Sequence, residues 1–424
     1  MDDRLKSLIE LYNKKNFLEL VREATEFVQQ NSSSAMVWNL LALGHRYSGN
    51  VQEARKIYDR LLKLNPDNFL LNTNAGNLFL SIGKLNDAVE CFNKALETEP
   101  DHITTLEAAA IALGDLGQAE KAKEYFRRVI EIDENYQSAR YHLARILVRE
   151  QSYREAIDHF EHTEYGLSKS HQLECIYHLG EKKLFFEKYN SLIAAKKINP
   201  LMASIGAHSA IRYSVPDINP FCRSPLNFIK KFNISTADGF NQQLIDQIIG
   251  YHKSAENDFR TQPLLKKGEQ SSGNLFLLEI DFIQDLQKLI LQKVNEYRKC
   301  FPKSNEGFLK FWPDKFTLYG WLVAIKTGGH LAPHIHKEGW LSGSLYFNLP
   351  KKPNSDEGNI SFSVDGADYP KNGKEFPSKT VDIEKGDLVL FPSSLFHKTI
   401  PFSGTEERVS FAFDVIPSKS LPAN

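Results

Sequence analysis

The sequence predicts a multidomain protein in which an all-α solenoid of repeated helix pairs is followed by an α+β domain with a jelly-roll core. Two observations carry this prediction. Over roughly the first 200 residues, small and large apolar residues return every 34 positions. After residue 315 the hydrophobic period changes to 2, which is the period of a strand with one buried face. A length of 424 residues also favours more than one domain.

Composition and charge place the chain among ordinary globular proteins. Hydrophobic residues make up 42% and charged residues 25%. The 52 Lys and Arg residues against 53 Asp and Glu give a net charge of -1, so no positive field favours nucleic acid or an anionic membrane. The four cysteines form no Cys-x-x-Cys pair, and the first residues contain no uninterrupted apolar stretch. We therefore expect a cytoplasmic protein with no nucleic-acid and no membrane partner.

The repeats share one register. The frame that starts at Ala35 has Trp38 at position 4, small residues at positions 8 and 20, and an aromatic residue at position 24. Small residues let two antiparallel helices approach closely, and large residues fill the space between neighbouring units. An imperfect unit precedes at about 1–34, and a degraded unit follows at about 171–200. The residues at positions 8, 20 and 24 of the four matching frames are Ala42, Ala54 and Tyr58; Gly76, Ala88 and Phe92; Ala110, Ala122 and Phe126; and Ala144, Ala156 and Phe160.

This pattern resembles the tetratricopeptide repeat. The resemblance implies a curved solenoid over residues 1–200, with about five to six repeats and a concave face that binds extended peptides. We expect a peptide or protein ligand on that face, although each polar residue there could also be an ordinary solvated position. The residues expected on the concave face are Asn39, Arg46, Asn77, Tyr141 and Arg145.

After Pro200 the 34-residue register is lost. The segment 211–228 concentrates Pro, Asn and Ser, which end helices and favour turns, so we place a domain boundary near residue 200. Residues 201–300 are predicted to form a linker and supporting helices, with apolar residues at helical spacing over 240–253 and 281–299.

Residues 301–424 are predicted to form the jelly-roll core. Short segments rich in Phe, Tyr, Val and Ile are separated by Gly, Pro, Asn and Asp, as expected of strands. The polar loop 365–378 between two of them could be a lid over a cavity mouth or a tolerated surface insertion. The segments are FTLYGWLVAIKT, LSGSLYFNLP, GNISFSV, KTVDIE, DLVLFP and RVSFAFDVI.

Three histidines in this region have the spacing of metal ligands. On a strand, His334 and His336 point to the same face and present two imidazoles to one point. His397 follows a buried strand, and in a jelly roll it could complete a facial three-ligand set. Arg408 could offer a permanently charged fork to a carboxylate, with Ser410 on the same face of its strand. The alternative for Arg408 is a surface ion pair with a neighbouring glutamate.

These motifs resemble the 2-oxoglutarate and Fe(II)-dependent oxygenase superfamily. The markers are His334-Ile335-His336, LSGSLYFNLP, KGDLVLFPSSLFH and the His397-x10-Arg408-x-Ser410 spacing, and residues 215–300 resemble the N-terminal part of such enzymes fused to tetratricopeptide repeats. The resemblance implies that the three histidines hold Fe(II), that Arg408 and Ser410 bind the distal carboxylate of the cosubstrate 2-oxoglutarate, and that Tyr346 adds a hydrogen bond. It also implies hydroxylation of a peptide or protein that the repeats recruit.

The second ligand position departs from the superfamily, which usually has Asp or Glu there. Either His334, His336 and His397 bind the metal, or the set shifts to His336, Glu338 and His397. Three neutral ligands would leave the site one unit more positive. This keeps open a three-histidine dioxygenase that does not use 2-oxoglutarate, and a repeat scaffold with a relic metal-binding jelly roll. We expect His330 to be an outer or solvent-facing residue, and candidates for the pocket wall are Trp321, Trp340, Phe347 and Phe396.

Overall fold

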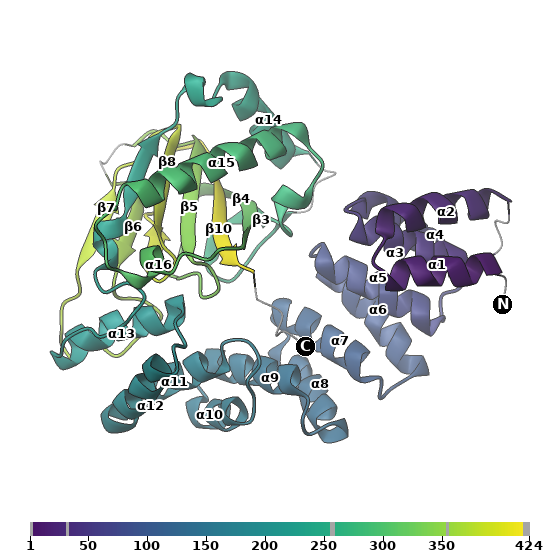
Figure 1. The fold of residues 1–424 in the computed structure, drawn as a ribbon, viewed down its shortest axis with the longest axis horizontal. Coiled ribbons are helices and arrows are strands. Elements are labelled where there is room, and N and C mark those ends of the chain that lie inside the picture. Colours follow the sequence, from purple (N-terminus) through teal and green to yellow (C-terminus); the bar gives the residue numbers. More distant parts are fainter. Residues whose placement is uncertain (1–2, 31–33, 255–258, 353–355, 419–424) are drawn as a thin grey trace. The chain divides into compact units, whose positions relative to one another are not determined.

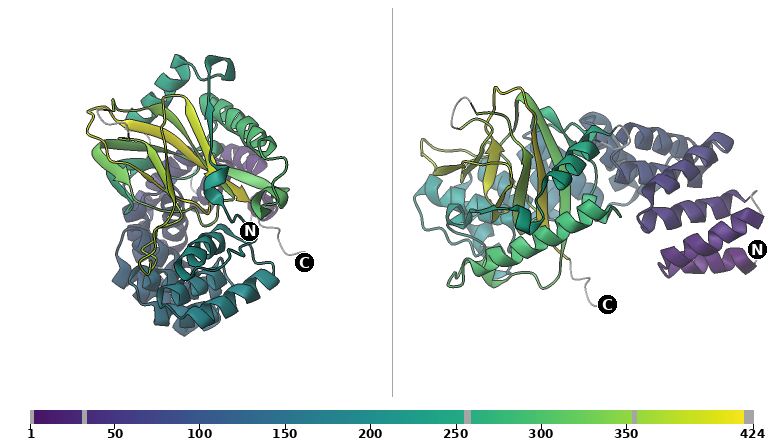
Figure 2. Two further views of the ribbon diagram at one scale, coloured as in Figure 1. Left: turned by 90° about the vertical axis from the view of Figure 1, so that its left-hand side faces the viewer. Right: turned by 90° about the horizontal axis from the view of Figure 1, so that it is seen from above.

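The computed structural model describes residues 3–30, 34–254, 259–352 and 356–418, and the chain divides into two compact units, Met1–Gly166 and Leu167–Asn424. The first unit is made of helices in the part of the chain that the structure describes. The second combines helices with two β-sheets (Figures 1 and 2). This confirms the predicted order of a helical solenoid followed by an antiparallel β domain.

Consecutive helices of the first unit pack in pairs, as expected of a tetratricopeptide-repeat solenoid (Figure 1). The helices are α1 Asp3–Asn13, α2 Phe17–Gln30, α3 Ala35–Tyr47, α4 Val51–Leu64, α5 Phe69–Ser81, α6 Leu85–Thr98, α7 Ile103–Asp115, α8 Ala119–Ile132, α9 Gln137–Arg149 and α10 Tyr153–Glu161.

The repeat positions explain why these helices can approach closely. At position 8 of the second frame, a Cβ added to Gly76 would lie 2.6 Å from the ring of Phe92, which occupies position 24 of the same frame. Such a contact is shorter than real Cβ atoms tolerate, so only glycine fits against this phenylalanine. The equivalent aromatic residues Tyr58, Phe126 and Phe160 are almost fully buried. The 34-residue pattern therefore reflects helix packing.

The residues predicted for the concave face differ in exposure. Asn39 is 2% exposed, and its side-chain oxygen accepts hydrogen bonds from Tyr58 Oη at 3.1 Å and from Asn74 at 3.0 Å. It therefore links neighbouring helices rather than facing solvent. Tyr141 is also buried, whereas Arg46, Asn77 and Arg145 are partly exposed.

The second unit begins with three helices that precede the β domain. The prediction placed the end of the repeat near residue 200, whereas the compact units divide after Gly166. The helices of the degraded repeat, α11 and α12, thus fold within the second unit. The predicted helices at 240–253 and 281–299 are confirmed as α14 and α15. The helices of the second unit are α11 Ser168–His178, α12 Lys182–Ala194, α13 Pro200–Tyr213, α14 Gln242–Lys253, α15 Asp281–Lys299 and α16 Gly307–Lys310.

Two antiparallel sheets form the β domain. The larger has the order β1-β8-β5-β10-β4-β3-β2 and the smaller the order β7-β6-β9. All six predicted strands are confirmed, as β4, β5, β6, β7, β8 and β10. Four strands were not predicted: β1, β2 and β3, which extend the larger sheet from the region assigned to helices and linker, and β9, which carries His397. The strands are β1 Lys230–Asn233, β2 Phe259–Arg260, β3 Leu265–Ser271, β4 Phe316–Leu331, β5 Leu341–Asn348, β6 Ile360–Ser363, β7 Ser378–Val381, β8 Asp387–Pro392, β9 Phe396–Thr399 and β10 Arg408–Pro417.

Strand alternation gives the larger sheet one apolar face and one face with polar side chains. On β10, Phe411, Phe413 and Val415 join the core beneath α14 and α15, and α15 crosses the sheet in Figure 1. Arg408, Ser410 and Asp414 have the opposite parity and face the smaller sheet. The space between the sheets therefore receives charged and hydroxyl groups.

None of the helices described here is long and apolar enough to cross a membrane.

Candidate metal centre

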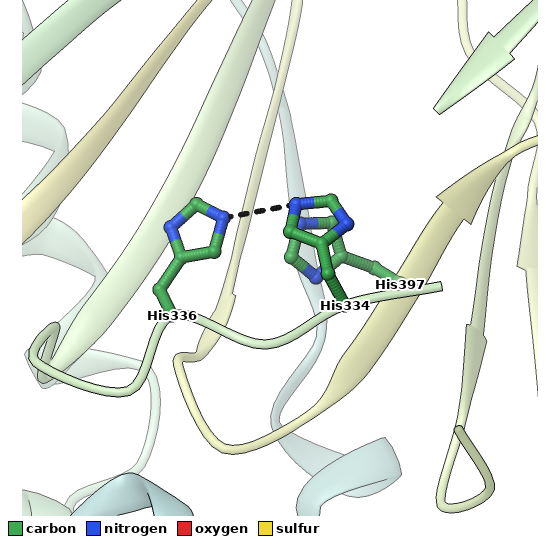
Figure 3. Close-up of side chains that lie close together, drawn as sticks. All are labelled: His334, His336 and His397. Atoms are coloured by element: carbon green, nitrogen blue, oxygen red, sulfur yellow. Dashed lines mark hydrogen bonds between the residues drawn. The ribbon is translucent and has the colours of Figure 1, made fainter. Parts of the chain in front are cut away.

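Three histidine side chains converge between the two sheets (Figure 3). His334 and His336 follow β4, and His397 lies on β9. The backbones of His334 and His397 form a bridge, with N–H to O distances of 3.1 and 3.0 Å. One ring nitrogen from each histidine lies within 4.8 Å of the other two, and the Nε2 atoms of His334 and His336 are 3.2 Å apart. Two nitrogens bound to one ion at about 2.1 Å and at a right angle would be about 3 Å apart, so this pair fits a shared metal ion.

The expected strand around the His-x-His pair is only one bridge long. The bridge between His334 and His397 is isolated, and the N–H of His336 donates to the carbonyl of Ser393 at 3.1 Å. His336 instead begins a turn, which the N–H of Gly339 closes by donating to the carbonyl of His336 at 3.1 Å. The two rings still point to one place (Figure 3), as the spacing of two residues predicts for extended backbone.

Hydrogen bonds at Nδ1 orient all three rings. Nδ1 of His334 lies 2.8 Å from the carbonyl of Ala332, and Nδ1 of His397 lies 3.2 Å from the carbonyl of Leu395. Nδ1 of His336 lies 2.5 Å from Oδ1 of Asp414. A carbonyl or carboxylate oxygen can only accept, so each Nδ1 carries the proton. Nε2 of each ring is then the nitrogen that faces the other two rings and could bind a cation placed between them.

Burial keeps two of the rings neutral. Burial, with a smaller contribution from the neighbouring His336, lowers the pKa of His334 to about 4. Burial likewise lowers the pKa of His397 well below its usual range. Metal ions bind the neutral imidazole, so both rings are in their ligating form at neutral pH and need not release a proton.

Asp414 places a negative charge directly behind one candidate ligand. Its Oδ1 accepts hydrogen bonds from His336 Nδ1 and, at 2.6 Å, from Ser342 Oγ. Ser342 Oγ lies 2.7 Å from Ser393 Oγ, and the carbonyl of Ser393 accepts from the N–H of His336. A carboxylate in this position fixes the ring and raises the basicity of its other nitrogen. The superfamily usually has a carboxylate among the metal ligands. Here the carboxylate of Asp414 instead contacts the far nitrogen of a candidate ligand, His336.

We expect Asp414→Asn to weaken binding of Fe(II) or Co(II) by about 10- to 100-fold, because the amide keeps the shape and removes the charge behind His336. The measurement is an anaerobic titration of the metal-free protein. Asp387→Asn is the matched control, since Asp387 is also buried in the same sheet and pairs with Lys231. Equal losses in both variants would show that the effect is not specific to the histidine that Asp414 contacts.

Arg408 is buried without an anionic partner. It is 3% exposed, and its Nε donates to the carbonyl of Gly358 at 3.0 Å. A second nitrogen lies 3.4 Å from Ser410 Oγ, and the guanidinium carbon lies 4.9 Å from the centre of the Tyr346 ring. Among the described residues, no carboxylate lies within ion-pair distance of Arg408, so the surface pair with Glu406 or Glu407 does not form.

Tyr346 adds a second unsatisfied group at the same place. Its ring is fully buried, and its hydroxyl has no hydrogen-bond partner among the residues that the structure describes. Burial raises the pKa of Tyr346, so the hydroxyl keeps its proton as a donor. A buried guanidinium costs several kcal/mol of desolvation unless an anion pairs with it. Arg408, Ser410 and Tyr346 together therefore fit a carboxylate ligand.

The structure places Glu338 and His330 outside the histidine cluster and divides the predicted wall residues between the site and the core. Glu338, the alternative ligand, is exposed on the turn and is not part of the cluster. His330 is half-buried near the end of β4 and also lies outside it. Of the proposed wall residues, Trp321 packs against His336, with the ring centres 5.6 Å apart and the ring planes tilted by 36°. Trp340 and Phe347 instead pack in the core beneath the helices.

Two aromatic residues that the sequence did not single out contact His397. The ring of Phe391 lies 4.6 Å away and that of Phe362 lies 6.2 Å away. Side chains alternate between the two faces of a strand, and both phenylalanines lie on the face that is directed at His397. Asp414 was also missed, although it has the same strand parity as Arg408 and Ser410, which was the available signal.

A cavity of about 650 Å³ lies beside His397. The loop 365–378 contributes much of its lining, including Asp365, Lys371 and Phe376, and strand residues Ser361 and Lys398 complete it. The loop therefore borders a cavity, and its place there is consistent with the expected lid. A volume of this size accommodates a small ligand or a few residues of a peptide.

Several solved structures are similar to part of this chain, each at low sequence identity. A tetratricopeptide repeat protein from Parabacteroides merdae is 15% identical, with 58% of this chain and 96% of that chain covered and a TM-score of 0.43. PilF from Pseudomonas aeruginosa is 16% identical, with 45% and 89% covered and a TM-score of 0.40. MamA from Desulfovibrio magneticus is 20% identical, with 38% and 93% covered and a TM-score of 0.36. No curated protein matches the chain.

Family models match three stretches. Residues 35–68 match the tetratricopeptide repeat, and residues 81–163 match the family described as "Anaphase-promoting complex, cyclosome, subunit 3". Residues 319–414 match the family described as "Putative 2OG-Fe(II) oxygenase", and this stretch contains all three converging histidines and Arg408. The chain therefore carries tetratricopeptide repeats in its N-terminal part and a domain of this 2OG-Fe(II) oxygenase family at residues 319–414.

Proposed function

We propose that the second unit is an Fe(II)- and 2-oxoglutarate-dependent oxygenase. The observation that carries the proposal is that one β domain contains two groups of side chains that each fit a missing ligand. Three histidines converge with ring nitrogens close to one another, and a buried guanidinium has no carboxylate partner among the described residues. A metal ion would complete the first site, and a dicarboxylate bound to that metal would complete the second.

Each residue would have a distinct task. His334, His336 and His397 would hold Fe(II) through Nε2, and Asp414 would keep the proton of His336 on Nδ1. Arg408 and Ser410 would bind the distal carboxylate of 2-oxoglutarate, and Tyr346 would donate its free hydroxyl to the same ligand. When bound, the metal and cosubstrate supply oxidative decarboxylation coupled to hydroxylation of a C–H bond. Trp321, Phe362 and Phe391 would keep water from that reaction.

The substrate we propose is a peptide or protein that the repeats recruit. Solenoids of this kind mediate protein–protein contacts through an extended surface, and polar side chains such as Arg46, Asn77 and Arg145 remain accessible on the first unit. The four cysteines are unpaired, and three of them are buried, as expected in a reducing compartment. We therefore place the reaction in the cytoplasm.

The test is an anaerobic titration of the metal-free protein with Fe(II), with and without 2-oxoglutarate. A bidentate 2-oxo acid on iron gives a weak visible charge-transfer band, and we expect this band only when both ligands are present. Admission of oxygen should then release succinate, in an amount that depends on iron.

The other results would each replace the proposal by a specific alternative. Iron binding without a band, followed by oxygen consumption that does not depend on 2-oxoglutarate, would indicate a three-histidine dioxygenase. Absence of transition-metal binding would indicate a repeat scaffold with a relic metal site.

A further inference from the structure

A buried carboxylate outside the matched stretch 319–414 contacts the segments that carry the candidate ligands. Glu174 lies on α11 and is 3% exposed. Its oxygens accept hydrogen bonds from Lys337 Nζ at 3.0 and 3.2 Å, from Tyr369 Oη at 3.0 Å and from His171 Nδ1 at 2.9 Å. All four residues belong to the second unit, so these contacts lie within one compact body.

One of these contacts reaches the segment of the first two histidines. Lys337 directly follows His336 and lies in the turn closed by Gly339. Its ion pair with Glu174 joins residues that are 163 positions apart in the sequence. The pair therefore ties to α11 a turn whose first residue, His336, is held on the sheet side by Asp414 and Ser393.

A second contact reaches the segment of the third histidine. The ring of Tyr369 packs against the ring of Phe396 at 5.7 Å, and Phe396 directly precedes His397. Tyr369 also packs against Tyr177 of α11 and His208 of α13, at 5.5 and 5.2 Å. The loop 365–378 is thus held between these helices and β9.

Glu174 is ionised in this environment. Burial alone would raise the pKa of its carboxyl, but the Lys337 ammonium and the hydrogen bond from His171 hold the pKa below its usual range. A buried ion pair costs desolvation, and loss of one partner leaves an uncompensated buried charge. We therefore expect the Glu174–Lys337 pair to fix the relative position of its two segments more than to raise the free energy of unfolding.

We propose that Glu174 is a positioning residue for the metal site, and that α11 to α13 are an integral part of the oxygenase unit rather than the last repeats of the solenoid. The carboxylate fixes the Lys337 turn and the Tyr369 loop together, and so sets the distance of His336 from His397. This inference rests on the proposed metal site and adds a requirement for a helix that precedes the family domain.

The test uses the full chain with Glu174→Gln, which keeps the size of the side chain and removes its charge. We expect Co(II) and Fe(II) affinity to fall about tenfold, the lower end of the effect of outer partners on metal sites, and the visible spectrum of bound Co(II) to change as the ligand geometry relaxes. Glu187→Gln is the matched control, because Glu187 is exposed on α12 of the same unit. The control should bind metal as the unchanged protein does.

Lys337→Met gives a second, independent measure. If Glu174 acts through Lys337, the double variant should lose no more affinity than the larger single loss, because both changes break the same Glu174–Lys337 ion pair. Additive losses would overturn the coupling. Thermal unfolding of each metal-free variant shows whether it is folded, and Tyr369→Phe replaces Glu174→Gln as the test if the latter does not fold.

Failure of this inference can be told from failure of the proposed function. If the unchanged protein binds metal and Glu174→Gln binds it equally tightly with the same Co(II) spectrum, the positioning role is wrong and the metal site stands. If the unchanged protein binds no metal, the proposed function fails and this inference fails with it.

Discussion

Replacement of His397 by alanine is expected to weaken Fe(II) binding by more than about 100-fold, because loss of an outer partner alone costs up to that factor and His397 is a proposed direct ligand. The ring is 7% exposed, and its Nδ1 is committed to the carbonyl of Leu395. Among the described residues, no hydrogen bond to its Nε2 accounts for the burial of this ring beside Phe362 and Phe391. The anaerobic titration described above measures the loss, together with the loss of the charge-transfer band.

His330→Ala is the control for this experiment. His330 is half-buried at the end of the strand that precedes the ligand segment, and it lies outside the histidine cluster. We expect it to leave iron affinity unchanged. If His397→Ala binds iron as tightly as the unchanged protein, the metal lies elsewhere and the three-histidine site is wrong.

The helical half of the fold could be predicted from short-range pattern alone. Each repeat contacts mainly its neighbours, so a small residue and a large residue recur at the same two positions of each repeat. Gly76 and Phe92 occupy these positions in the second frame. The division at Gly166 is a different matter. The degraded repeat over α11 and α12 keeps helical periodicity, but its partners are far away in the sequence, and Glu174 with Lys337 is one such contact. The periodicity of a single sequence does not reveal contacts between residues that are far apart in that sequence.

The sequence predicted the spacing of the candidate metal ligands. It did not predict the residues that hold these ligands in place, such as Asp414. Spacing of two residues is enough to bring His334 and His336 together, since extended backbone fixes the direction of alternate side chains. Asp414 lies 78 positions from the His336 ring that it contacts, and only the pairing of β10 with β5 and β4 brings it there. The strand that carries His397 has four residues, too few for a period of two to be recognised.

Arg408→Met should separate cosubstrate binding from folding more sharply than any other substitution. The guanidinium is 3% exposed and has no carboxylate partner among the described residues, so it carries a desolvation cost of several kcal/mol in the ligand-free protein. Methionine removes this cost and also removes the hydrogen bonds to Gly358 and Ser410, a loss of about 1–3 kcal/mol. Because these terms oppose each other, we expect the free energy of unfolding to change by about 1 kcal/mol or less.

The affinity for 2-oxoglutarate should behave in the opposite way. Truncation of one partner of a buried charge pair costs about 2–5 kcal/mol of binding, which corresponds to a loss of about 30- to 5,000-fold. Thermal unfolding with Fe(II) present measures both effects at once, since a ligand that binds only the folded state raises the midpoint. The unchanged protein should be stabilised by 2-oxoglutarate, and Arg408→Met should not.

Each combination of these two quantities has one physical meaning for Arg408. Retained stability with lost stabilisation by 2-oxoglutarate means that the guanidinium is buried for a ligand. A large loss of stability in the ligand-free variant would instead mean that Arg408 is a structural residue satisfied by Gly358, Ser410 and the Tyr346 ring. Unchanged stabilisation by 2-oxoglutarate would move the cosubstrate to another part of the site. A buried cation without a counter-ion costs folding free energy, and a carboxylate ligand that offsets this cost is the reason we expect the first result.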